Sequence, residues 1–184
     1  MRTRYAVALG VATAALAAAV LVPGASAEGP SSSGAAQDLA SARAATAGDH
    51  QLATARQAGY SILRDAAGIA CIDEPTVGAM GVHYVDGAAV GDPAVVPNHP
   101  EALVYEPTKN GRMQLVALEY VVLKADWDAL HPDPPSLFGQ EFMVTPDPNR
   151  FGLPAFYSLH AWIWKHNPAG MFAMWNPDVS CAAA

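Results

Sequence analysis

The sequence predicts an α+β fold in which an N-terminal helical segment packs on a curved antiparallel sheet of about five strands. Three observations support this prediction: apolar residues recur at helical spacing before Cys71, they alternate at a spacing of two after it, and two turn motifs separate the alternating runs. The 184 residues suit one domain. We expect a signal peptide over 1–27, a flexible leader over 28–36 and one globular domain over 37–184.

The first 27 residues have the pattern of a secretory signal. Arg2 and Arg4 precede an apolar run that reaches Val22, and Ala25-Ser26-Ala27 supplies the small residues of a cleavage site. The alternative is a membrane anchor, because the run is near the lower length limit for spanning a bilayer. The pattern favours a secreted, extracellular protein, and no later run is long enough to place a membrane span in the mature chain.

Two helices are expected after the leader, which is rich in Ser, Gly and Pro. Residues 37–66 are rich in alanine, and Gly48-Asp49 divides them, with Asp49 as the N-cap of the second helix. Gly68 is the expected stop. The stripe that predicts the second helix has spacings of three and four: Leu52, Ala55, Gly59, Ile62 and Ala66.

Five strands are expected after Cys71, near 81–85, 102–106, 112–123, 156–166 and 171–175. Asn110-Gly111 predicts a tight hairpin turn between the second and third. Asn167-Pro168-Ala169-Gly170 fits a type I turn, which makes 156–175 a second hairpin. The proline-rich stretch 126–154 is expected to be a long surface loop.

Charge and cysteine content narrow the class of protein. The formal net charge of −7 argues against a nucleic-acid partner, since such proteins usually carry a basic patch. Cys71 and Cys181 are the only cysteines, and in an exported chain a disulfide between them is the default. The alternative, a catalytic or metal-binding thiol pair, lacks the usual CxxC spacing.

The two longest strands are apolar on both faces, yet each contains an ionisable residue. Glu119 is expected to share a face with Leu115, Ala117 and Val121, and His160 with Phe156, Trp162 and Trp164. Such strands are covered on both sides. A carboxylate and an imidazole there need partners, because an unpaired buried charge is costly.

His83 lies between apolar neighbours in the first strand, and with Glu119 and His160 it could form a two-His-one-carboxylate metal site. A divalent metal is therefore the cofactor to consider. Two alternatives stay open: a polar pocket for a small molecule, and a purely structural hydrogen-bonded network. Because the three residues come from separate strands, their spacing does not decide whether they meet. The aromatic residues expected to line a pocket are Tyr84, Tyr105, Tyr120, Trp162 and Trp164.

Other candidate groups carry little signal. His166 precedes a turn and is expected to be exposed, and Glu101 and Glu106, at the two ends of a strand, are expected to be surface charges. The sequence contains no GxSxG, HExxH, Walker or GxGxxG pattern, so the common serine hydrolase, zincin and nucleotide-binding classes lack support.

Several segments resemble a family of small exported bacterial proteins, common in actinobacteria. They are MGVHYV at 80–85, PEALVYEP at 100–107, LEYVV at 118–122, and the stretch from LHAWIWKHNP at 159–168 to WNPDVSC at 175–181. The resemblance covers most of residues 45–181, implies export and adds weight to His83, Glu119 and His160. It implies no reaction. Met174 stands where an acidic residue is expected before Trp-Asn-Pro.

These observations together favour a non-enzymatic small-ligand-binding protein with an aromatic pocket around His83, Glu119 and His160. The first alternative is a metal-dependent enzyme that uses the same three residues to activate water or an oxygen species. The second is a structural or cell-envelope interaction protein whose polar core serves only to specify the fold. Convergence of the three side chains on one point would distinguish a metal site from the others.

Overall fold

The computed structural model describes residues 30–184, so the expected signal peptide and its cleavage site lie outside the described residues. In this part of the chain no helix combines the length and apolar character needed to cross a bilayer.

The helical segment differs from the prediction at both ends. Helix α1 spans Pro30–Thr46 and begins inside the expected leader, because proline suits a first helical turn. A 3₁₀ turn, η1 (Ala47–His50), separates it from the short α2 (Leu52–Gln57). The predicted stripe to Ala66 is wrong, since the chain reverses at Gly59, whose φ is 106°.

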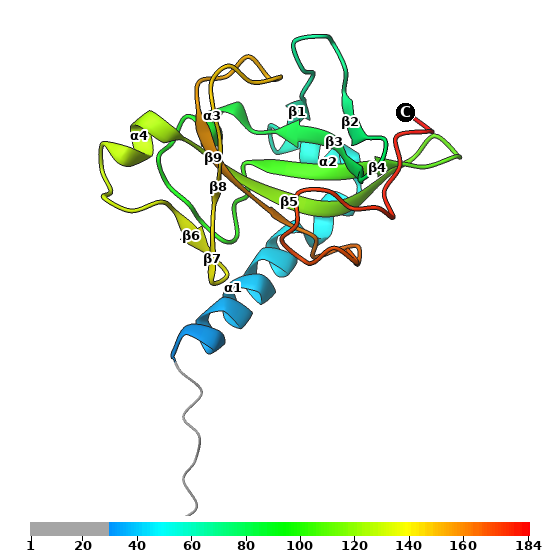
Figure 1. Ribbon diagram of the computed structural model, residues 1–184. Coiled ribbons are helices and arrows are strands. Elements are labelled where there is room, and N and C mark those ends of the chain that lie inside the picture. The colour runs from blue at the N-terminus through cyan, green and yellow to red at the C-terminus, as the bar shows by residue number, and fades with distance from the viewer. Residues whose placement is uncertain (1–29) are drawn as a thin grey trace, which may run out of the picture.

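The main sheet has seven strands and is antiparallel in every pair, which confirms the α+β class with more strands than expected. The strands lie in the order β1-β3-β4-β5-β9-β8, and β2 also pairs with β3 (Figure 1). Their bounds are β1 Ser61–Ile62, β2 Cys71–Glu74, β3 Gly78–Val85, β4 Ala102–Pro107, β5 Met113–Leu123, β8 Met143–Thr145 and β9 Phe156–Ala161.

The expected surface loop over 126–154 contains regular structure. Helix α4 (Lys124–Asp128) follows β5, a small two-stranded sheet pairs β6 (Ser136–Leu137) with β7 (Gln140–Glu141), and β8 then adds to the edge of β9. A further short helix, α3 (Gly87–Val90), links β3 toward β4 and is capped by Asp86, which accepts from the backbone N–H of Ala88 and Ala89.

The second predicted hairpin is wrong. Strand β9 ends at Ala161, and residues 171–175 form turns. Side-chain hydrogen bonds replace strand pairing here: Asn167 donates to the carbonyl of Trp175, Asn176 to that of His166, and the Trp162 indole to that of Ala173. These local side-chain bonds compete with a strand ladder.

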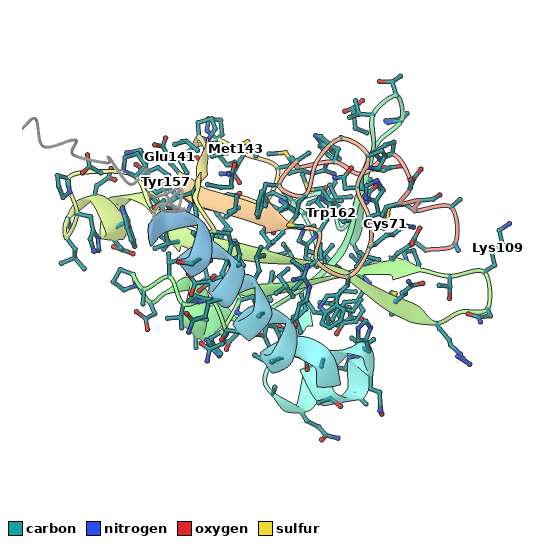
Figure 2. The ribbon with its side chains drawn as sticks, turned by 90° about the horizontal axis from the view of Figure 1, so that it is seen from below. Cys71, Lys109, Glu141, Met143, Tyr157 and Trp162 are labelled. Carbon is teal, nitrogen blue, oxygen red and sulfur yellow. A yellow bond between two sulfur atoms is a disulfide. The ribbon has the colours of Figure 1, made fainter. Side chains whose placement is uncertain are left out.

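Helices α1 and α2 cover one face of the sheet. Figure 2 shows α1 crossing that face, with Lys109 at the far tip of the β4–β5 hairpin. The larger core cluster lies between them and includes Ala42 and Ala55 from the helices. Its sheet residues include Tyr84, Leu103, Tyr105, Leu115, Leu118, Tyr120, Val122 and Leu159.

The opposite face is covered in part by the C-terminal segment. A second cluster joins Ala79, Val104, Val116, Ala117 and Trp162 of the sheet side to Val179. The predicted disulfide is present: Cys71 at the start of β2 is bonded to Cys181, 110 residues later. The C-terminal segment is thus held to the sheet by a covalent bond and by an Ala79–Asn176 backbone bridge.

A bulge between β4 and β5 changes which residues share a face. Val104 pairs with Ala117 while Tyr105 pairs with Leu115, so Val116 is an extra residue. Leu115 therefore joins the helix-covered core and does not share a face with Glu119, as simple alternation had predicted.

Gly81 allows β3 to approach β4 closely beside this bulge. Its φ is 108°, and an added Cβ would lie 2.6 Å from the carbonyl oxygen of Tyr105. We expect Gly81→Ala to lower the free energy of unfolding by about 2–3 kcal/mol, because both the backbone conformation and the contact oppose a side chain. Urea denaturation measures this loss. Gly111→Ala is the control: Gly111 also has positive φ but has open space around it, so an equal loss there would contradict the contact argument.

Candidate metal centre

Strands β3, β5 and β9 bring His83, Glu119 and His160 together on the face away from α1 and α2. Glu119 on β5 lies directly opposite His160 on β9, while His83 comes from β3 on the other side of β4. Between His83 and Glu119, strand β4 places only the side chains of Ala102 and Val104 on this face. These short side chains leave room for the imidazole and the carboxylate to meet across β4.

The polar atoms of the three side chains converge. His83 Nε2 lies 3.2 Å from Glu119 Oε2 and 3.5 Å from His160 Nε2, and His160 Nδ1 lies 3.5 Å from Glu119 Oε1. With one donor atom taken from each residue, all lie within 4.8 Å of one another. Both histidines are buried and Glu119 is 12% exposed. The sequence had supplied the three residues, and the structure shows that they meet.

The ionisation of the group suits a cation. Burial alone would raise the pKa of Glu119, but the charge on His160 and hydrogen bonds from His83 and Ser158 outweigh it and bring the pKa to about 2. Burial lowers the pKa of His160 below its usual value, and the charge of Glu119 only partly offsets this. Both shifts favour the states in which these groups bind metals, a carboxylate and a neutral imidazole.

Hydrogen bonds within the protein do not satisfy this group. The Nδ1 atoms of His83 and His160 are buried, and neither has a hydrogen-bond partner among the described residues. An unpaired buried polar atom costs about 1–3 kcal/mol. The Nε2 atoms of the two rings face each other at 3.5 Å, which is long for a hydrogen bond.

The spacing also resembles a metal coordination shell. Ligands about 2.0–2.2 Å from one ion lie about 2.8–3.6 Å from each other in tetrahedral or octahedral geometry. The distances from His83 Nε2 to Glu119 Oε2 and to His160 Nε2 fall in this range. His160 turns one ring nitrogen to His83 and the other to Glu119, so only one of them can bind the ion, and the group must close slightly around it.

Two neighbours support the three residues. Ser158, buried on β9 two residues before His160, helps to lower the pKa of the Glu119 carboxyl. Trp162 stacks on His160 with ring centroids 6.1 Å apart and an angle of 19° between the planes. Trp162 was expected beside the site, whereas sequence reasoning missed Ser158. The signal available in the sequence was that Ser158 lies two residues before His160 in the same predicted strand and therefore on the same face.

The tyrosines expected to line the site do not. Tyr84, Tyr105 and Tyr120 belong to the helix-covered core, because Tyr84 and Tyr120 directly follow His83 and Glu119 and so point to the opposite face. The hydroxyls of Tyr105 and Tyr120 donate to the carbonyls of Asp49 and Pro97. These residues are structural.

Trp164 also lies on the helix side, after β9 has ended. Its indole donates to Thr46 and packs edge-on against His50. His166 is exposed, as expected.

The two glutamates expected at the surface, Glu101 and Glu106, both accept hydrogen bonds within the protein. Glu106 accepts from Lys165 Nζ at 2.7 Å and is partly buried. Glu101 is 3% exposed and accepts from the backbone N–H of Val121 at 2.9 Å. Burial raises the pKa of Glu101 to about 8. The expectation of a surface charge was wrong for Glu101, because its strand end is covered by the 86–100 connection and not by solvent.

No protein-family model, no curated protein and no solved structure matches this chain. The resemblance to an exported bacterial family therefore stays a prediction, and the function is argued from the site.

Proposed function

We propose that this protein is a metal-binding protein in which His83, Glu119 and His160 hold one divalent first-row transition ion and present it to a small molecule. The convergence of two imidazole nitrogens and one carboxylate from three strands carries the proposal. Two histidines and a carboxylate form a ligand set used for catalytic zinc and for non-haem iron(II).

An ion held by three protein ligands has open coordination positions. Such an ion polarises the oxygen of a bound molecule or lowers the pKa of a bound water. The chemistry is that of the metal-dependent enzyme considered from the sequence, and we place it ahead of the metal-free binding protein. The Nε2 atoms of His83 and His160, which face each other at 3.5 Å, support this order, since a cation between them would engage both lone pairs.

A metal-free pocket for a small ligand is the second candidate. The distance of 3.2 Å between His83 Nε2 and Glu119 Oε2 supports it, because it is a hydrogen-bond length. A purely structural network is the third candidate, and it gives no partner to the buried Nδ1 atoms of His83 and His160.

Metal content tests the proposal directly. We expect the purified wild-type protein, stripped and then exposed to Zn²⁺, to retain about one ion per chain by elemental analysis and to melt at a higher temperature. His160→Ala should lose stoichiometric binding. Ser158→Ala should weaken Zn²⁺ affinity by about tenfold, because it frees the Glu119 carboxylate.

The matched control is His166→Ala, which removes an exposed histidine six residues away and should bind Zn²⁺ like the wild type. Circular dichroism confirms that each variant is folded, and Glu119→Gln replaces His160→Ala should that variant unfold. A folded wild type that binds no Zn²⁺, Fe²⁺ or Co²⁺ would exclude the metal centre and leave the metal-free pocket.

We also propose that the protein is exported. The N-terminal signal pattern supports this, and so does the Cys71–Cys181 disulfide, which persists in oxidising compartments. Mass spectrometry of the protein from the culture medium should give a mature chain that begins at Glu28. Recovery of the intact chain from the cytoplasm alone would contradict export.

A further inference from the structure

An apolar cavity of about 340 Å³ lies on the sheet face beside Glu119. The C-terminal segment covers one end of this face and stops short of the other, where the cavity lies. Residues of β1 and α3 contribute to its lining, and both elements lie on the side of the sheet away from α1 (Figure 1). The volume is at the lower end of the range for ligand pockets, about 300–1,000 Å³. A molecule with one ring and a short substituent suits this size.

The walls of the cavity are almost entirely apolar. Val85, Ala102, Val121 and Phe156 of the sheet line it, together with Phe151 and Leu153 from the loop before β9. Glu119 is the one titratable residue in the lining, and neither histidine reaches it. The carboxylate therefore lies between the cavity and the two imidazoles.

The loop that carries Phe151 and Leu153 is held in place by hydrogen bonds. The Asn149 amide donates to the carbonyls of Pro146 and Leu153, and its oxygen accepts from the backbone N–H of Phe151. Arg150 pairs with Asp65 at 2.8 Å. These contacts fix the wall without a ligand, which favours binding because little ordering is needed.

We infer that this cavity binds a small apolar molecule with a single anionic head group, such as an arylalkyl monocarboxylate, with its carboxylate on the metal ion. The inference rests on the proposed metal centre. A divalent ion with one carboxylate and neutral imidazoles leaves a net positive charge at the inner end of an apolar cavity, and an anion neutralises it. Without the ion, Glu119 alone would repel a carboxylate and attract an ammonium group instead.

Two probes of similar size and opposite charge test this inference. We expect phenylacetate to bind the Zn²⁺-loaded protein, by isothermal titration calorimetry, at least about tenfold more tightly than 2-phenylethylamine. Removal of Zn²⁺ with EDTA should abolish phenylacetate binding. Val121→Phe should fill the cavity and lose phenylacetate while it keeps its Zn²⁺. Val144→Phe, at an exposed position of β8, is the control and should bind both.

The outcomes separate the inference from the metal centre. Zn²⁺ binding without phenylacetate binding at millimolar concentration would overturn the inference and leave the metal centre standing. Tighter binding of 2-phenylethylamine would overturn the anionic head group, and phenylacetate binding unchanged by EDTA would overturn the contact between its carboxylate and the metal ion. Failure to bind any metal would remove the proposed function and this inference with it.

Discussion

Replacement of both cysteines should remove a large part of the stability of this protein. The Cys71–Cys181 bond closes a loop with a sequence separation of 110 residues. In the chain-entropy model, a crosslink over a loop of this length stabilises the folded state by up to about 4–5 kcal/mol, since it restricts the unfolded chain. We expect the Cys71→Ala/Cys181→Ala variant to lose about 2–5 kcal/mol in urea denaturation.

The loss should also have a local component. Val179, two residues before Cys181, packs on the cluster that contains Trp162, and Trp162 stacks on His160. The variant should therefore be cleaved near its C-terminus by a protease that spares the wild type. Wild-type protein treated with a reductant is the control and should match the variant. An unchanged denaturation midpoint in both samples would show that the disulfide does not stabilise the fold.

Glu101 should make the protein less stable as the pH rises above the acidic range. Its carboxyl has a pKa of about 8 in the folded protein, raised by burial from an ordinary value of 4.5. Below pH 4.5 both states hold the proton, so the contribution to stability is fully present. Between pH 4.5 and 8 the unfolded state releases its proton first, and the free energy of unfolding falls by at most about 5 kcal/mol.

Glu101→Gln should flatten this profile and be more stable than the wild type at pH 8. Glutamine keeps an oxygen for the Val121 N–H and carries no charge. Glu106→Gln is the control, because Glu106 is partly exposed and paired with Lys165. Thermal melts of the three proteins between pH 4.5 and 8.5 provide the measurement. Parallel profiles for the wild type and Glu101→Gln would contradict a buried neutral carboxyl.

Glu119 should act in a different pH range. Its pKa is lowered to about 2, so its contribution to stability is present above pH 4.5 and is lost as the pH falls toward 2. One series of thermal melts at different pH values can therefore distinguish the contribution of Glu101 to stability from that of Glu119.

The sequence by itself determined the fold class, the main strands and the cysteine pair. Apolar runs bounded by turn residues marked β3, β4 and β5, and Asn110-Gly111 marked the hairpin that joins the last two. The sequence also singled out His83, Glu119 and His160, because an ionisable residue in a strand that is apolar on both faces needs a partner. Each of these inferences uses only local periodicity or the identity of one residue.

Only the tertiary structure decided which residues share the site. Strand order placed His83 across β4 from Glu119, and no spacing in the chain encodes that neighbourhood. The bulge at Val116 moved Leu115 to the other face, and side-chain hydrogen bonds from Asn167 and Asn176 replaced the expected hairpin.

Burial at the end of a strand was equally hidden from the sequence. Glu101 lies at a position that local patterning assigns to solvent, yet the 86–100 connection that precedes it folds back to cover it. The cavity beside Glu119 also depends on packing, because it is formed where the C-terminal segment stops and the 146–154 loop begins to cover the sheet. Local propensity sets the strands, but non-local contacts set which face is covered and by what.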